Sequence, residues 1–218
     1  MNKAKVKICG LTTESSVEAA VNGGADFVGF VFHPKSPRNI GIDNAIALAN
    51  SALDLNPDVQ IVAVTVNPDN EFLRHLQDSL CPDFIQLHGV ETLARVSEVQ
   101  AMGFKVINAI GIETAEDLKS AQPYFDAADL VLFDAKPPKN AANAGGFGIA
   151  FDWEIMRGFE CETPWFLSGG LNPSNVASAI AATGAPMVDV SSGVESAVGV
   201  KDLALIKSFI NAAKGEKV

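Results

Sequence analysis

The stretch KVKICGLTTESSVEAAVNGGADFVGFVF (residues 5–32) contains one complete strand–helix–strand pattern. Apolar, β-branched residues at Val6–Ile8 and Phe27–Phe32 are typical of buried strands, whereas the apolar residues within Ser16–Val21 recur at helical spacing. Parallel neighbouring strands need a crossover connection, which is usually a helix. The stretch therefore predicts two parallel strands in one sheet.

The same alternation continues along the rest of the chain. Helical spacing recurs between the apolar runs, and the helix after the sixth run is expected to be short, at Trp153–Arg157. The expected helix caps are Thr12 or Thr13, Asp43, Thr114 and Asn172. The eight predicted strands are Val6–Ile8, Phe27–Phe32, Ile61–Val66, Phe84–Leu87, Lys105–Ala109, Leu130–Phe133, Trp165–Leu167 and Met187–Val190.

Eight strand–helix units of about 27 residues each match a closed barrel at the short end of its size range. The predicted fold is therefore α/β, a single (β/α)8 TIM barrel that forms one domain over residues 1–218. A doubly wound open sheet is the alternative. It ranks second because the units continue to the C-terminus without a linker or a low-complexity stretch.

Composition narrows the class of partner. The formal net charge is −10, so nucleic acid would be repelled at long range, although backbone amides can still bind a small anion. Three cysteines without close spacing predict neither a disulfide framework nor a zinc site, which favours a reducing, cytoplasmic location. No apolar run reaches the ~20 residues that a membrane span requires, so no membrane partner is expected.

Glycine-rich segments follow the last three predicted strands, at Gly145–Gly148, Gly169–Gly170 and Gly193. Each taken alone could mark a turn. Loops seven and eight are the usual phosphate cradle of this barrel, and three such segments in successive loops favour a phosphate-binding site.

Cys9 stands where the first predicted strand ends, which is where the chemistry of this barrel lies. It is either an inert buried thiol or a thiolate base whose pKa is lowered by a nearby lysine. Strand alternation places Lys7 on the same face as Cys9, so both should point into the barrel mouth. Cys81 and Cys161 are expected to be structural or incidental.

Polar residues also end or follow other strands. Asp134 interrupts an apolar run, which suits either a general acid or a helix cap or salt bridge to Lys136. His88 is either a structural hydrogen-bonding residue or a catalyst, and Arg38 is either a carboxylate grip or a solvated loop charge. Asp189 is expected to order loops through backbone amides.

With these residues assembled, the chain resembles the phosphoribosylanthranilate isomerase family of tryptophan biosynthesis essentially from end to end. The resemblance is specific because the motifs occur as an ordered set. They are KICG (7–10), GADFVGFVFHPKSPR (24–38), IQLHG (85–89), LVLFDAK (130–136), GGFGIAFDW (145–153), LSGGLNPSNV (167–176) and VDVSSGVE (188–195).

The resemblance implies an isomerase that carries out an Amadori rearrangement of N-(5-phosphoribosyl)anthranilate to 1-(2-carboxyphenylamino)-1-deoxyribulose 5-phosphate, without a cofactor or a metal. It implies Cys9 as general base and Asp134 as general acid. Arg38 would bind the anthranilate carboxylate, and His88 would lie near the substrate. The phosphate would be held by the backbone of Gly146, Gly170, Ser192 and Gly193.

The sequence departs from the family pattern at Phe147, where Ser or Thr is usual, at Asn39, where an aromatic residue is usual, and at Thr65, where Phe is common. Phe147 puts in doubt a side-chain contact to phosphate from that position. Asn39 and Thr65 bear on the anthranilate side of the pocket. The resemblance leaves the oligomeric state open between monomer and homodimer.

Two rival functions stand beside this one. Another phosphosugar enzyme of this fold could use metal-binding His and Asp residues, yet the chain has only three His. It could instead use a catalytic lysine at a strand end, but Lys136, two residues past Asp134 and followed by two prolines, is a poor candidate. The other rival is a barrel that binds a phosphorylated metabolite without catalysis. Intact Cys9, Asp134 and Arg38 argue against it.

Overall fold

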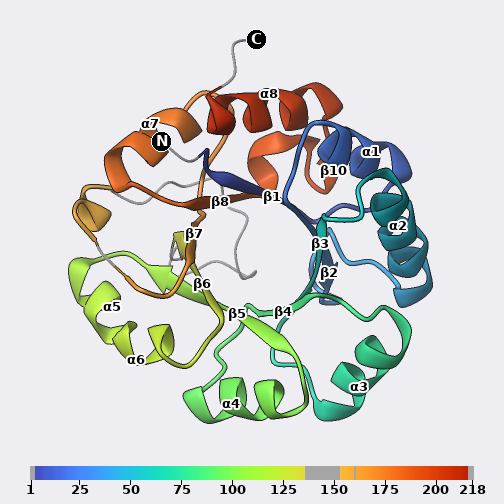
Figure 1. Ribbon diagram of the computed structural model, residues 1–218, viewed down its shortest axis with the longest axis horizontal. Helices are drawn as coiled ribbons and strands as arrows, with labels where there is room; N and C mark the ends of the chain where they lie inside the picture. Colours follow the sequence, from blue (N-terminus) through green and yellow to red (C-terminus); the bar gives the residue numbers. More distant parts are fainter. Residues whose placement is uncertain (1–2, 136–152, 160, 216–218) are drawn as a thin grey trace.

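The computed structural model describes residues 3–135, 153–159 and 161–215. Its eight parallel strands form a closed barrel in the order β1 to β8, with helices around the outside (Figure 1). The strands are β1 (Lys5–Cys9), β2 (Phe27–Phe32), β3 (Gln60–Thr65), β4 (Phe84–Leu87), β5 (Lys105–Ile112), β6 (Leu130–Ala135), β7 (Trp165–Leu167) and β8 (Met187–Val190). The prediction of a (β/α)8 barrel is confirmed, and the open sheet is excluded because β1 pairs with β8.

The outer ring consists mainly of α-helices that connect successive strands. The helices are α1 (Glu14–Asn22), α2 (Ile42–Leu55), α3 (Asn70–Ser79), α4 (Leu93–Ala101), α5 (Ala115–Ser120), α6 (Gln122–Phe125), α7 (Val176–Thr183) and α8 (Leu203–Lys214), with 3-10 helices η1 (Trp153–Met156) and η2 (Ser192–Val194). The predicted caps Thr13 and Thr114 are confirmed. Those at Asp43 and Asn172 were wrong, because α2 starts after Gly41 and α7 after Asn175.

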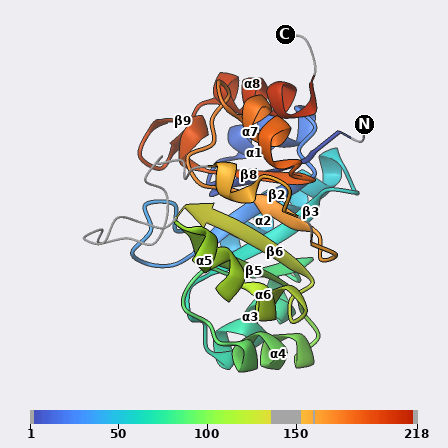
Figure 2. The ribbon, with the colours of Figure 1, turned by 90° about the vertical axis from the view of Figure 1, so that its left-hand side faces the viewer.

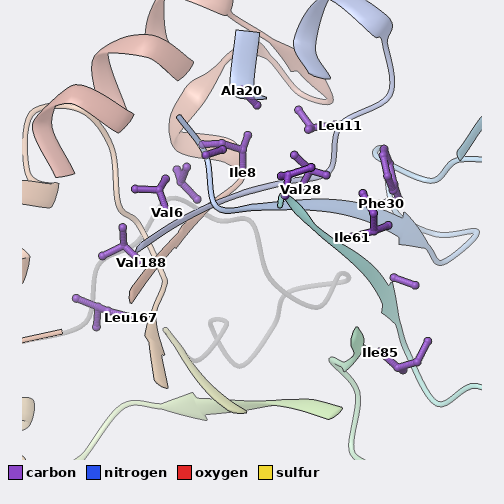
Figure 3. Close-up of a cluster of buried hydrophobic side chains, with 14 of the residues drawn as sticks. Val6, Ile8, Leu11, Ala20, Val28, Phe30, Ile61, Ile85, Leu167 and Val188 are labelled. Carbon is purple, nitrogen blue, oxygen red and sulfur yellow. The ribbon is translucent and has the colours of Figure 1, made fainter. Parts of the chain in front are cut away.

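Strand alternation divides the core into two layers. Outward-facing residues such as Val6, Ile8, Val28 and Phe30 pack toward the helices, where Ala20 of α1 meets them (Figure 3). Inward-facing residues form a second cluster that fills the barrel: Cys9, Phe27, Val62, Val64, Phe84, Ile107, Leu130, Leu132, Phe166 and Met187. Both faces of each strand are therefore buried, which explains why the strands read as nearly continuous apolar runs.

A small hairpin not predicted from the sequence follows the barrel. Strands β9 (Glu195–Ala197) and β10 (Val200–Lys201) pair antiparallel. Figure 2 shows β9 toward the end of the barrel to which the arrow of β6 points. The hairpin therefore belongs to the end where the strands give way to their βα loops. Among the residues that the structure describes, no helix is long and apolar enough to span a bilayer.

Candidate active site

Cys9 is the last residue of β1 and is almost completely buried, with 6% of its surface exposed. The amides of Gly10 and Leu11 both donate to the carbonyl of Gly29, which fixes the chain just after the thiol. The carbonyl of Cys9 itself accepts from the Ser191 hydroxyl at 3.0 Å. Burial raises the pKa of the Cys9 thiol, and the positive charge of Lys7 opposes that rise. Desolvation thus outweighs the nearby lysine, and the structure does not show the lowered pKa on which the interpretation of Cys9 as a thiolate base depended.

Lys7 shares the inward face of β1 with Cys9, as strand alternation predicted. Its ammonium lies 2.8 Å from Asp189 Oδ1, and both side chains are buried. The other carboxylate oxygen of Asp189 accepts from the Ser168 hydroxyl at 3.2 Å. Asp189 therefore binds side chains of β1 and the β7 loop, and the expectation that it orders loops through backbone amides was wrong.

Asp134 belongs to β6, which continues past the predicted end at Phe133. Its carboxylate oxygen Oδ2 lies 3.4 Å from His88 Nε2, and both side chains are partly exposed. The amide nitrogen of Gln86 lies 2.7 Å from His88 Nδ1. When that amide donates, Nδ1 is the acceptor and a neutral imidazole carries its proton on Nε2, facing Asp134. The structure thus brings two residues of the predicted site, His88 and Asp134, together.

Arg38 lies in the loop between β2 and α2 and is held by a residue of the hairpin. Its Nε and Nη2 atoms donate to the two carboxylate oxygens of Glu195 at 2.6 and 2.8 Å. Lys201 Nζ donates to Glu195 Oε1 at 2.9 Å, and the Gly199 amide donates to Oε2 at 3.0 Å. Arg38 is therefore a fixed fork rather than a solvated loop charge, and its Nη1 atom is the one that Glu195 does not use.

The hydrogen-bond donors around Glu195 favour the ionised form of its carboxyl group. Burial would raise its pKa, but the hydrogen bonds from Arg38 and the charge and hydrogen bond of Lys201 lower it to about 2. Lys201 also donates to the carbonyl of Ser191 at 2.7 Å, immediately before η2. One buried lysine thus connects the arginine fork with the loop after β8. Glu195 belongs to the motif VDVSSGVE (188–195), but no role was predicted for it, and Lys201 was not predicted as a site residue.

The two described glycine loops, after β7 and β8, lie against one another. A side chain on Gly193 would stand 1.8 Å from the carbonyl oxygen of Leu171, so only glycine fits at this close approach. Gly170 has a positive φ of 67°, and its carbonyl accepts from the Asn175 side chain at 3.0 Å. Ser192 opens η2 beside Gly193. Gly193 therefore lies directly against the loop after β7, the loop that contains Gly170.

Some predicted residues contribute elsewhere or cannot be placed. Thr65 is buried and donates to the carbonyl of Gln86 at 3.2 Å, and Asn39 forms a bridge with Val31 of β2. Gly146, Phe147 and Lys136 lie outside the described residues.

Cys81 is exposed and Cys161 is partly buried, and both are free thiols. Among the described parts of the chain, no group of three or more His, Cys, Asp or Glu side chains could hold a metal ion.

Comparison with known proteins assigns the chain to a family. The family model described as N-(5'phosphoribosyl)anthranilate (PRA) isomerase matches residues 6–212. The N-(5'-phosphoribosyl)anthranilate isomerase of Rhodopseudomonas palustris is 48% identical over 213 residues, which cover 97% of this chain and 96% of that protein.

Solved structures of the same enzyme have the same fold. The crystal structure of phosphoribosyl anthranilate isomerase from Thermotoga maritima is 38% identical, with a TM-score of 0.85 over 97% of this chain and 99% of that one. A second structure is in complex with reduced 1-(o-carboxyphenylamino)-1-deoxyribulose 5-phosphate. It is 36% identical, with a TM-score of 0.82 and the same coverage of both chains. The present chain belongs to the N-(5'-phosphoribosyl)anthranilate isomerase family.

Proposed function

We propose that Cys9 and Asp134 are the general base and the general acid with which this isomerase rearranges N-(5'-phosphoribosyl)anthranilate to 1-(2-carboxyphenylamino)-1-deoxyribulose 5-phosphate. The observation that carries the proposal is their placement. Both residues stand at the C-terminal ends of strands of one closed barrel: Cys9 on β1 is almost completely buried, and Asp134 on β6 is partly exposed. That end of the barrel is where the active sites of this fold lie.

The acid acts first. Asp134 gives its proton to the ring oxygen of the ribose, the bond from that oxygen to carbon 1 breaks, and the nitrogen lone pair forms an iminium at carbon 1. His88 Nε2, 3.4 Å from Asp134 Oδ2, orients the carboxyl group, which regains its proton from solvent.

The base acts on the opened sugar. The thiolate of Cys9 takes the proton from carbon 2, and the electron pair of that bond forms the double bond between carbons 1 and 2 as the iminium becomes a neutral amine. The resulting enolamine tautomerises to the ketone. An iminium is a strong electron sink, so a thiolate suffices as base, and no cofactor takes part in these steps.

The remaining predicted residues bind the substrate. Arg38 receives the anthranilate carboxylate, because a fixed guanidinium suits a planar anion. Backbone amides of Gly146, Gly170, Ser192 and Gly193 receive the phosphate, since the loops after β7 and β8 supply the phosphate site of this fold. His88 lies beside the acid and close to the substrate.

The experiment follows the fluorescence decay of N-(5'-phosphoribosyl)anthranilate, generated in place from anthranilate and its ribosyl donor. Cys9→Ala and Asp134→Asn should each lose most of the turnover while keeping the wild-type melting temperature. Cys81→Ala, at the opposite end of the barrel before β4, is the matched control and should retain full activity. A near-wild-type rate in either active-site variant would remove the role assigned to that residue.

We also infer that residues 1–218 form a single domain and that the protein works in the cytoplasm as a monomer or homodimer. The single domain is supported by the pairing of β1 with β8, which joins the two ends of the chain in one barrel. Light scattering after size-exclusion chromatography distinguishes the two oligomeric states.

A further inference from the structure

Lys7 is a charged side chain placed inside the barrel with no exposed surface. Removing an ammonium group from water costs several kcal/mol unless a partner compensates for it. Asp189 supplies that compensation: β1 and β8 pair in a register that sets Lys7 opposite Asp189, and their charged atoms lie 2.8 Å apart. Burial alone would lower the pKa of Lys7, but Asp189 and Cys9 raise it, so Lys7 stays charged.

The position of the pair within the barrel suggests what it does. The cluster that fills the barrel is otherwise apolar and includes Phe27, Phe166 and Met187. Replacement of a buried ion pair by apolar residues is often neutral or stabilising, so stability alone does not explain why a charged pair lies here. The groups that surround the pair indicate a second role.

Cys9 is a neighbour of the Lys7–Asp189 pair. A β-carbon on Gly29 would lie 3.2 Å from Cys9 Sγ and 3.4 Å from Lys7 Cε, so the thiol and the end of the lysine side chain border the same small space. Gly29 pairs with Cys9 across β1 and β2, and its missing side chain allows that approach. Of the charged groups that act on the thiol most strongly, Lys7 and Lys201 favour its ionisation, whereas Asp189 opposes it.

We propose that Lys7, held in place by Asp189, is a positioning residue whose ammonium stabilises the thiolate form of Cys9. The inference rests on the proposed role of Cys9 as base. Burial shields the sulfur and makes its ionisation difficult, yet the reaction needs the ionised form. A fixed positive charge beside the sulfur offsets that difficulty, and the thiol proton passes to solvent before substrate enters.

The test measures ionisation of the thiol directly. The rate at which iodoacetamide alkylates Cys9 is followed against pH by mass spectrometry of the peptide that contains it. In the double variant Lys7→Met/Asp189→Asn, which leaves no unpaired buried charge, the pKa of the Cys9 thiol should rise by about one unit, because the loss of the favourable Lys7 charge outweighs the loss of the unfavourable Asp189 charge. Lys5→Met removes an exposed charge from the same strand and should leave it unchanged.

Turnover supplies the second readout. At neutral pH the double variant should lose about tenfold in kcat, and raising the pH by about one unit should restore it. An unchanged alkylation profile, or an equal change in Lys5→Met, would overturn the proposal. Failure of the double variant to fold would also overturn it, because the pair would then serve the barrel. Alkylation requires no turnover, so the result for Lys7 stands apart from a failure of Cys9 as base.

Discussion

Replacement of Glu195 by glutamine tests whether the arginine fork is a preformed part of the site. The carboxylate accepts from two Arg38 nitrogens, from Lys201 and from the Gly199 amide. A glutamine side chain has one oxygen, so its NH2 group would face two of these donors in either orientation. Glu195→Gln should therefore free Arg38 from its fixed position while leaving Cys9 and Asp134 in place.

The magnitude follows from the freedom that Arg38 regains. An arginine side chain carries about 2 kcal/mol of rotamer entropy, and Arg38 loses it when the protein folds, because Glu195 holds its guanidinium in one position. In the variant, substrate must remove it on binding. Because about 1.4 kcal/mol corresponds to a factor of ten, the KM for N-(5'-phosphoribosyl)anthranilate should rise about 10- to 30-fold. The kcat should change less than about threefold, since the role proposed for Arg38 is in binding rather than in proton transfer.

The assay is steady-state fluorescence decay with wild type, Glu195→Gln, Arg38→Ala and a matched control. The control is Glu113→Gln, which changes an exposed glutamate just after β5, at the same end of the barrel. Arg38→Ala should raise the KM at least as far as Glu195→Gln, and Glu113→Gln should not alter it. If Arg38→Ala raises the KM and Glu195→Gln does not, Arg38 binds the carboxylate without the help of Glu195, and the reasoning is refuted.

Two further predictions concern Gly29 and acid stability. Gly29→Ala places a β-carbon 3.2 Å from the Cys9 sulfur. The kcat should fall about tenfold, while the melting temperature changes by only a few degrees. An unchanged kcat would show that the reaction does not depend on the space beside the thiol. Because the pKa of Glu195 is lowered to about 2, its contribution to stability is fully present above pH 4.5 and disappears as the pH falls toward 2. Urea unfolding should therefore show that wild type loses about 1 to 2 kcal/mol more than Glu195→Gln over that range, after allowance for screening by solvent.

Much of the barrel could be predicted from local pattern. Apolar runs bounded by turns identify strands that are buried on both faces, and β2, β4, β7 and β8 have the predicted bounds. The largest errors lie at the C-terminal ends of two neighbouring strands. The strand β5 was predicted to stop at Ala109 but runs to Ile112, and β6 includes Asp134, because pairing between these two strands continues to their ends. The hairpin was missed because β9 and β10 are too short to show a period.

The site could be predicted only one strand at a time. Alternation along β1 correctly placed Lys7 on the same face as Cys9. The partner of Arg38, by contrast, lies 157 positions later in the chain, and nothing local to Glu195 indicates that contact. The same holds for His88 and Asp134, whose proximity follows from the order β4–β5–β6 in the sheet. Their residue types indicated chemistry, but their contacts arise only from tertiary structure.

Two contacts connect β1 with β8 and with the loop that follows β8, and both depend on residues that are synthesised late. The Lys7–Asp189 pair and the Ser191–Cys9 hydrogen bond each join residues 182 positions apart. A growing polypeptide that has emerged from the ribosome as far as β7 already carries the thiol, but it lacks both groups from the last quarter of the chain. The contacts that join β1 to β8 therefore form only after β8 has been synthesised, so the proposed site is incomplete in a shorter chain. Such distant pairing raises the entropy cost of closing the barrel at this point.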